Sequence, residues 1–337
     1  MGKRIVAFDI IKLIAIYLVI LGHSTQHLLS SFEYEEPVYL FIYSFHMPLF
    51  MFLSGFFSYK ELIDKKIALG GARKRLSQLI IPCIIATFLH LLLLAILMDD
   101  VSIITQPTTW RNELYNTLWF LKSLFICYVI YVTISLFPMS LKIVVTLLFL
   151  LMIPFVGYFR LSLMLPSFLF GVFARKYDIF QKTNVMILFI SAPLFLTCLH
   201  YWNADSLIQT RASLHGLLNG NFSSFFHYLY VLLTGFSGTL LCCSFFYWLI
   251  GRIGNSVVVQ RISTFGRYTL GIYIIQTFLL ETILSFYVKL DIIFSPVICN
   301  TIIIPILSFG ILISCILLVK LICKNKSLSF LLLGYSN

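Results

Sequence analysis

Long apolar blocks, separated by short polar segments, follow one another along the whole chain. Their bounds fall at residues 8–29, 38–58, 78–98, 116–137, 142–158, 161–174, 184–202, 226–250, 268–288 and 296–322. Most of them approach the roughly 20 apolar residues that a helix needs to cross a bilayer. Because the blocks are continuous rather than alternating, they predict helices and not the strands of an outer-membrane barrel. The pattern predicts an all-α polytopic transmembrane bundle of about ten spans.

One predicted hairpin is less regular than the rest. The block at 161–174 is short for a full crossing, so it either tilts little or lies within protein rather than in lipid. The block before it ends in Pro154, Gly157 and Arg160. We therefore expect residues 142–174 to depart most from the simple pattern.

Composition excludes a water-soluble globular protein. Of the 337 residues, 60% are apolar and only 11% are charged, and the mean hydropathy is +0.98. A soluble protein carries about a quarter charged residues, because its surface must be solvated. No long polar linker marks a second domain, so residues 1–337 are predicted to form a single membrane domain.

The basic residues predict the orientation of the chain. The net charge of +11 does not indicate a nucleic-acid partner, because the basic residues lie between the apolar blocks. With the N-terminus in the cytoplasm, eighteen of the 24 Lys and Arg residues, Lys3 and Arg4 among them, fall in cytoplasmic segments and four fall outside. This bias predicts that both termini are cytoplasmic.

All eight cysteines fall inside apolar blocks, and none forms a CxxC pair or lies beside a histidine at ligand spacing. They are predicted to be small packing residues. Neither a disulfide scaffold nor a metal site is expected.

The first predicted span contains Asp9, Lys12 and His23 among its ionisable side chains. Asp9 lies three residues before Lys12, close enough to pair with it. Lys12 and His23 are about three helical turns apart, so they share a face to within ~20° and are ~16 Å apart along the axis. Ionisable groups inside a span cost a few kcal/mol each and usually line a polar interior. The alternative is a self-neutralised pair at the interface, with His23 as a snorkelling polar side chain.

A second histidine lies early in the next span, within the run Phe45-His46-Met47-Pro48-Leu49-Phe50. Pro48 frees a backbone carbonyl there, which is tolerated only where protein or water can satisfy it. His46 and His23 are predicted at similar depth, so they could converge on one cavity. His90 has no such neighbour and is interpreted as a packing residue.

Two later spans add further candidates. The run Leu118-Trp119-Phe120-Leu121, followed by Lys122, opens the fourth span at the outer interface. An aromatic residue at that depth is commonly an interfacial anchor, which is the alternative interpretation of Trp119. Glu281 lies beside Gln276 in the ninth span, where the alternative is a polar contact between helices. In either case Glu281 is predicted to face the bundle.

The loop at 60–78 is strongly basic and contains Gly70, Gly71 and the cluster Arg73, Lys74 and Arg75. The simpler interpretation is an orientation signal that also contacts anionic lipid headgroups. The alternative is a phosphate site, because Arg binds phosphate through two hydrogen bonds and glycine allows close approach of the backbone.

In this order, the motifs resemble those of the acyltransferase-3 family of integral-membrane acyltransferases, which move acetyl or similar groups onto cell-envelope sugars. The resemblance covers nearly the whole chain. The motifs are Phe8-Asp9-x-x-Lys12 with Lys12-x10-His23, the run Ser44–Phe56, the basic loop running into Pro82, the run Leu118–Leu121, and Gly266-x-Tyr268-Thr269-Leu270-Gly271-Ile272-Tyr273.

Two positions depart from the family pattern. The family often has a second Arg three residues after the first in the basic loop, where this chain has Gln78. Many members also have a histidine late in the Tyr-containing motif, where this chain has Gln276.

The resemblance implies transfer of an acyl group, acetyl in the first instance, from cytosolic acetyl-CoA to a hydroxyl of a polysaccharide or lipid-linked sugar. Acetyl-CoA would be a co-substrate, with no permanently bound cofactor, and the protein would contact lipids of a bacterial inner membrane. We predict His23 as the general base, because imidazole titrates near neutral pH. Asp9 and Lys12 would organise the polar path beneath it.

The remaining candidates are predicted to bind substrates. The acceptor or the developing oxyanion would be held by His46, Trp119, Lys122 and Glu281. The nucleotide end of CoA would be held by Arg73, Lys74 and Arg75. The alternative function is a transporter or flippase for a sugar-linked or acylated metabolite, because intramembrane ionisable groups also couple protons to transport. A polysaccharide polymerase is less well supported, since the outside loops are small.

Overall fold

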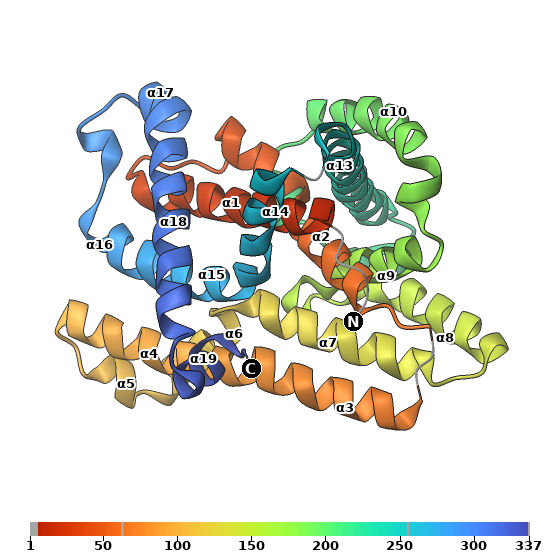
Figure 1. Cartoon of the computed structure of the whole chain (residues 1–337), viewed down its shortest axis with the longest axis horizontal. Coiled ribbons are helices and arrows are strands. Elements are labelled where there is room, and N and C mark those ends of the chain that lie inside the picture. Colours follow the sequence, from red (N-terminus) through yellow and green to blue (C-terminus); the bar gives the residue numbers. More distant parts are fainter. Residues whose placement is uncertain (1–5, 62–63, 255, 336–337) are drawn as a thin grey trace. The chain divides into compact units, whose positions relative to one another are not determined.

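The computed structural model describes residues 6–61, 64–254 and 256–335, so Lys3 and Arg4 lie outside the described residues. All regular structure within these ranges is helical (Figure 1). The prediction of an all-α protein is confirmed.

The helices follow one another with short connections. Those up to residue 155 are α1 (Val6–Leu28), α2 (Pro37–Ser58), α3 (Lys65–Arg75), η1 (Leu76–Ile80), α4 (Ile81–Met98), α5 (Ser102–Thr105), α6 (Pro107–Asn116), α7 (Trp119–Ser135), α8 (Met139–Met152) and η2 (Ile153–Phe155). The next are η3 (Tyr158–Arg160), α9 (Leu161–Lys176), α10 (Ile179–His200), α11 (Ala204–Ile208), α12 (Leu214–Leu218), α13 (Ser223–Ile253), α14 (Val257–Phe265) and η4 (Gly266–Tyr268). The last are α15 (Thr269–Gln276), η5 (Thr277–Leu284), α16 (Ser285–Tyr287), η6 (Leu290–Ile292), α17 (Pro296–Ile298), η7 (Cys299–Ile303), α18 (Ile304–Ile322) and α19 (Lys326–Leu333).

The number of spans is smaller than the pattern of apolar blocks predicts. Within the described ranges, seven helical segments are long and apolar enough to cross a membrane, or eight if α6 and α7, which meet at 63°, form one span. The predicted hairpin accounts for most of the difference. Met139–Phe155 is an apolar helix too short to count, and α9 has 16 residues. Sixteen residues rise only about 24 Å, less than the ~30 Å hydrocarbon core. The count of about ten is therefore not confirmed.

The chain divides into two compact units, which are described separately. The first consists of Met1–Leu18, Tyr34–Leu69 and Ile126–Arg267, and the second of Val19–Glu33, Gly70–Phe125 and Tyr268–Asn337. Helix α1 contributes residues to both. The single membrane domain over 1–337 stays a prediction.

In the first unit, α2 packs against α9 and α13, and α10 packs against α13 (Figure 1). Glycines allow the closest of these contacts. A Cβ on Gly55 would lie 1.9 Å from the carbonyl oxygen of Phe168, and a Cβ on Gly171 would lie 1.9 Å from that of Phe52. Small residues at an interface let two backbones touch, which is a common way of packing membrane helices.

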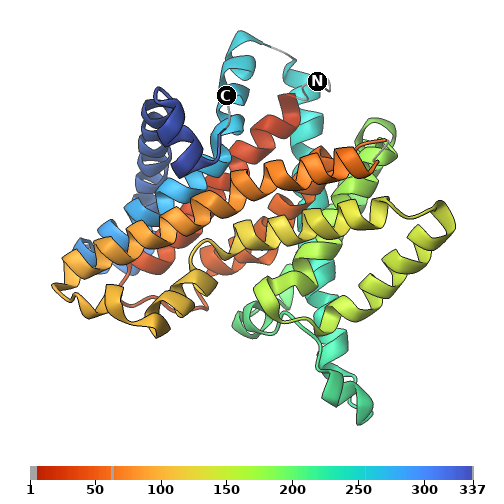
Figure 2. The ribbon, with the colours of Figure 1, turned by 90° about the horizontal axis from the view of Figure 1, so that it is seen from below.

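The two helices of the irregular hairpin have different surroundings. Helix α9 buries ten residues, from Leu161 to Ala174, so it lies within protein, one of the two arrangements that its length allowed. Helix α8, all of whose residues are described, buries none, and it lies at an edge of the first unit (Figure 2). Its exposed leucines are the surface that lipid would cover.

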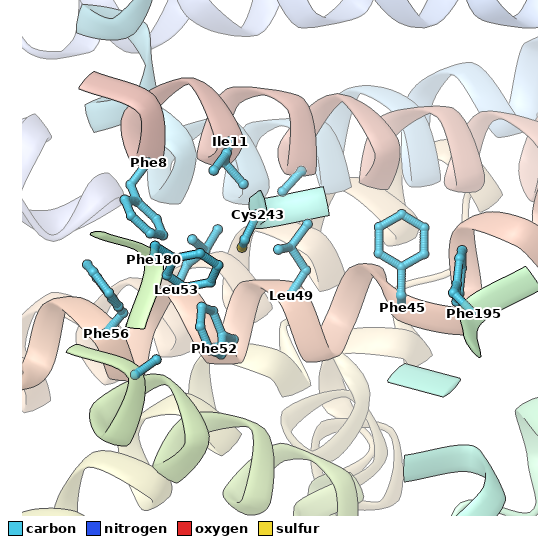
Figure 3. Packing of buried hydrophobic residues seen from close by; sticks show 12 residues of the cluster. Phe8, Ile11, Phe45, Leu49, Phe52, Leu53, Phe56, Phe180, Phe195 and Cys243 are labelled. Atoms are coloured by element: carbon cyan, nitrogen blue, oxygen red, sulfur yellow. The ribbon is translucent and has the colours of Figure 1, made fainter. Parts of the chain in front are cut away.

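An aromatic core lies at the centre of the first unit (Figure 3). Phe8 of α1 stacks on Phe56 of α2 with ring centroids 4.3 Å apart, and it meets Phe180 of α10 edge-on. Cys243 of α13 is fully buried in the same cluster. Six of the eight cysteines are buried, as expected of packing residues, and Cys242 and Cys323 are half-buried.

In the second unit, α15 packs against α18 and α4 packs against α19. After α19, Gly334 packs against the backbone of Gln78 in the same unit. Its φ is +68°, and a Cβ at this position would lie 2.1 Å from the Gln78 carbonyl oxygen, so only glycine fits there. The next residue, Tyr335, accepts the backbone N–H of Gly271 at 3.1 Å through its hydroxyl. That N–H lies in the first turn of α15, where it has no partner within the helix.

Candidate active site

In the second unit, a histidine and a carboxylate predicted separately from the sequence lie side by side. Nδ1 of His23 on α1 is 3.8 Å from Oε1 of Glu281 on η5, and the side chains are 23% and 24% exposed. Both side chains are thus largely enclosed yet reachable. Glu281 therefore faces the packed interior of its unit, as the sequence predicts.

A π-helix positions Glu281. The segment η5, between α15 and α16 in Figure 1, runs for eight residues with the wider π spacing. As a result, Nε2 of Gln276 donates to Oε1 of Glu281 at 2.9 Å, although the residues are five apart, and the hydroxyl of Thr277 donates to the same oxygen at 3.3 Å. π-helical turns are rare and are frequently found at functional sites. Gln276 thus supplies an N–H to this carboxylate.

A further histidine, His27, lies close to His23 and Glu281 and is not among the residues predicted from the sequence. Its ring centroid is 5.9 Å from that of His23, one turn earlier on α1, and its carbonyl oxygen accepts from Nζ of Lys289 at 2.9 Å. Donor atoms of His23, His27 and Glu281 lie within 4.8 Å of one another, so the three could hold a divalent cation. The i, i+4 spacing of the two histidines was the available sequence signal, because it places them on one face.

A second histidine–carboxylate pair lies in the same unit. Nε2 of His90 on α4 is 3.6 Å from Oε2 of Glu113 on α6, and Nδ1 is 3.0 Å from the hydroxyl of Thr282 on η5. The hydroxyl of Thr117 donates to the same Glu113 oxygen at 2.7 Å. His90 therefore does more than fill space, and its interpretation as a packing residue overlooked these polar partners, which come from distant parts of the chain.

Lys122 lies in the first turn of α7, just after the bend between α6 and α7. Its ammonium group donates to the carbonyl oxygens of Leu114, Tyr115 and Thr117, the last two at 3.2 and 2.8 Å. These are the carbonyls at the C-terminal end of α6, which have no partner within that helix. Lys122 thus caps α6, and its contact with a substrate stays a prediction.

Trp119 is half-buried at the start of α7, where the preceding Leu118 has a φ of +52°. Its ring meets Phe120 edge-on, and Phe120 in turn meets Tyr273 with centroids 5.8 Å apart. Tyr273 belongs to the Tyr-containing motif, so two of the sequence motifs are in contact within the second unit.

The Asp9–Lys12 pair, which belongs to the first unit, is confirmed. Nζ of Lys12 is 3.3 Å from Oδ1 of Asp9, and it also lies 3.6 Å from the ring centroid of Phe57. Gly266 of the late motif approaches the backbone of Asp9 so closely that a Cβ would lie 2.1 Å from its carbonyl oxygen. The glycine at this motif position is therefore required by close packing against α1.

His46 also belongs to the first unit, where it is buried. Its Nδ1 lies 2.8 Å from the carbonyl oxygen of Ile42, and its ring meets that of Tyr43 at 4.5 Å. A carbonyl oxygen can only accept, so Nδ1 carries the proton in this contact. His23 belongs to the second unit, and convergence of the two histidines on one cavity stays a prediction.

Arg73, Lys74 and Arg75 form the last turn of α3. Arg73 and Lys74 are exposed and Arg75 is half-buried. The helix continues through η1 into α4, so these side chains lie along a longer helical segment, Lys65–Met98, rather than at its end. Their binding of a nucleotide stays a prediction.

Comparison with known proteins gives partial relatives and one family. The chain is 32% identical over 133 residues to the nodulation protein NolL of Mesorhizobium japonicum, which is 38% of this chain and 35% of that protein. It is 30% identical over 124 residues to NolL of Sinorhizobium fredii, which is 36% of this chain and 34% of that protein. The match therefore spans about a third of each of these curated relatives. No solved structure matches.

The family comparison covers almost the whole chain. A family model described as "Acyltransferase domain" matches residues 5–320, a range that holds both histidine–carboxylate pairs, the Asp9–Lys12 pair and the basic turn of α3. This chain, with its several helices able to cross a membrane, therefore belongs to the acyltransferase-3 family of membrane acyltransferases.

Proposed function

We propose that the chain is an O-acyltransferase that moves an acetyl or similar acyl group from cytosolic acyl-CoA to a hydroxyl of a polysaccharide or lipid-linked sugar. Family membership supports acyl transfer itself. The donor and the class of acceptor rest on the ordered motifs described above. The nodulation proteins do not define the acceptor, because only about a third of each is matched.

The contact between His23 and Glu281 carries this proposal. In the proposed mechanism, the carboxylate 3.8 Å away orients the His23 ring with Nδ1–H directed towards it, and Nε2 accepts the proton of the substrate. A base oriented in this way by a third group is the general arrangement for activating a nucleophile. Glu281 also stabilises the imidazolium that forms, and the hydrogen bonds from Gln276 and Thr277 keep its carboxylate in place.

The reaction then proceeds by addition and elimination at the thioester. Nε2 of His23 removes the proton of the acceptor hydroxyl as its oxygen bonds to the thioester carbonyl carbon. The tetrahedral intermediate collapses to the ester, the carbon–sulfur bond breaks, and the imidazolium returns the proton to the leaving thiolate. General-base catalysis of this kind contributes about 10²–10⁴-fold.

The other predicted residues have supporting roles in this proposal. Asp9 and Lys12 form a polar pair on α1, and Arg73, Lys74 and Arg75 hold the nucleotide of the donor on the cytoplasmic side. The acceptor is held by His46 and Trp119, with Lys122 keeping α6 and α7 at their angle. The setting is a bacterial inner membrane, where donor and acceptor are both accessible.

Purified protein tests the proposal directly. We expect release of free CoA thiol from acetyl-CoA in the presence of acceptor, with at least ~10²-fold loss in His23→Ala. A matched control is His200→Ala, which removes an exposed histidine at the end of α10 in the first unit. Thiol release that is unchanged in His23→Ala would refute the assignment of the base. Absence of transfer by the wild type, together with movement of a sugar-linked lipid across vesicles, would instead indicate the transporter.

A further inference from the structure

The first unit contains a cavity that none of the predicted site residues lines. Its volume is about 260 Å³, somewhat below the ~300 Å³ at which ordinary ligand pockets begin. Its walls come from the segment after α2 and from α7, α8 and α9. A cavity of this size suits a compact group rather than a whole cofactor.

The charge of the lining is unbalanced. Three lysines, Lys60, Lys142 and Lys176, face the cavity, and the single acidic residue among the lining residues is Glu61. The nearby carboxylate of Asp178 lies 3.5 Å from Arg175, so it is engaged elsewhere. Ammonium groups that share a partly enclosed space repel one another, and a bound anion relieves that repulsion.

Local helix structure explains only part of this arrangement. Lys176 is the last residue of α9, where a positive charge offsets the helix dipole. Lys142 lies in the first turn of α8, where the dipole opposes a positive charge. The position of Lys142 is therefore unfavourable for α8 itself, and an anion in the cavity would account for it.

Aromatic side chains and one cross-chain contact give the cavity a defined shape. Tyr59, Tyr131 and Tyr177 line it, and the hydroxyl of Tyr131 on α7 accepts the backbone N–H of Lys60 at 3.4 Å. This bond connects the segment after α2 to α7. The ammonium of Lys176 also lies 5.2 Å from the ring centroid of Tyr177.

The three lysines come from segments that the charge bias predicts on the cytoplasmic side. In the structure they meet at one cavity within one unit. A cytoplasmic cavity is accessible both to soluble phosphates and to the headgroups of the inner leaflet.

We propose that this cavity binds a phosphate-bearing group. Lysine binds phosphate as a point charge, and three such charges suit a group with more than one negative charge. A soluble phosphate ester is one source of such a group. The headgroup of an anionic phospholipid is the other source of the same chemistry.

The test measures binding to the intact protein in detergent, using inorganic pyrophosphate as the probe in calorimetry. We expect Lys142→Gln to weaken binding about tenfold, the effect of losing one charged hydrogen bond. Lys142→Arg should retain most of the affinity, which would show that the charge matters rather than the exact side chain. The control is the double variant Lys320→Gln with Lys324→Gln, which removes two positive charges near the end of α18, outside the cavity.

A second measurement distinguishes the two sources of the phosphate. Lipid that stays bound to the protein after extraction is identified by mass spectrometry. Phosphatidylglycerol that is retained by the wild type and lost from the triple variant Lys60→Gln, Lys142→Gln and Lys176→Gln would support the site with a headgroup as occupant. Pyrophosphate binding that the triple variant loses would support it with a soluble phosphate. The proposal is overturned if neither ligand depends on the three lysines. His23→Ala does not enter this test, so the acyltransfer proposal can fail independently.

Discussion

The two units of the chain use polar residues in different ways. The first is organised around close helix contacts at Gly55 and Gly171 and an aromatic core, and its polar cluster at Asp9 and Lys12 is a local pair on one helix. The second has two histidine–carboxylate pairs whose members come from different parts of the chain. Close packing is the main feature of one unit and acid–base groups are the main feature of the other.

This difference indicates where stability and chemistry can be altered separately. A pair formed three residues apart on one helix needs no tertiary structure, whereas Glu281 reaches His23 only because helices from distant segments pack together. Substitutions in each unit test whether packing and acid–base chemistry are divided between the units in this way.

The largest effect on activity within the second unit is expected for Glu281→Gln. The amide has nearly the same shape but cannot stabilise an imidazolium, so we expect about 10²-fold loss in kcat. The KM for acetyl-CoA should remain close to the wild-type value. Steady-state kinetics checks this, and a variant with full kcat would remove Glu281 from the mechanism.

The same substitution at two glycines, Gly171 of the first unit and Gly70 of the second, should have opposite effects. Gly171→Ala places a methyl group against the Phe52 carbonyl, so we expect a loss of about 1–3 kcal/mol in the free energy of unfolding. Gly70→Ala, within α3, meets no atom within 4 Å and should stabilise the protein by up to about 1 kcal/mol. Denaturant or thermal unfolding in detergent measures both. Equal stability of the two variants would show that α2 and α9 do not touch at Gly171.

A smaller effect on activity is expected for the second pair. His90 contacts Glu113 and Thr282, so His90→Gln should reduce kcat by less than about tenfold, by loosening η5. A loss as large as that of His23→Ala would make His90, rather than His23, the candidate base. Kinetics of the two variants side by side would decide between them.

The smallest effect is expected from metal removal. Although His23, His27 and Glu281 could hold a cation, Glu281 already accepts from Gln276 and Thr277. We expect dialysis against EDTA to leave kcat unchanged and elemental analysis to find no stoichiometric metal. Activity that is lost with EDTA and restored by Zn²⁺ would replace the general-base mechanism with a metal-assisted one.

The site could be predicted from the sequence only in part, and for a physical reason. An ionisable side chain that interrupts an apolar block is a candidate, because such a group is costly in lipid. That rule identifies Asp9, Lys12, His23 and Glu281. It fails for Glu113, which lies in a polar segment where a carboxylate is unremarkable, and it says nothing about which histidine meets which carboxylate.

The sequence by itself determined the helical class and the bounds of the first two helices, predicted at 8–29 and 38–58 and observed at Val6–Leu28 and Pro37–Ser58. It also determined the pairing of Asp9 with Lys12. These features depend on interactions within a few residues of one another, which the order of side chains specifies. Only the tertiary structure decided that Glu281 meets His23, that α9 is enclosed by protein, and that three lysines share a cavity. Such contacts depend on how helices pack and on the π-helical turn of η5, which the apolar pattern does not encode.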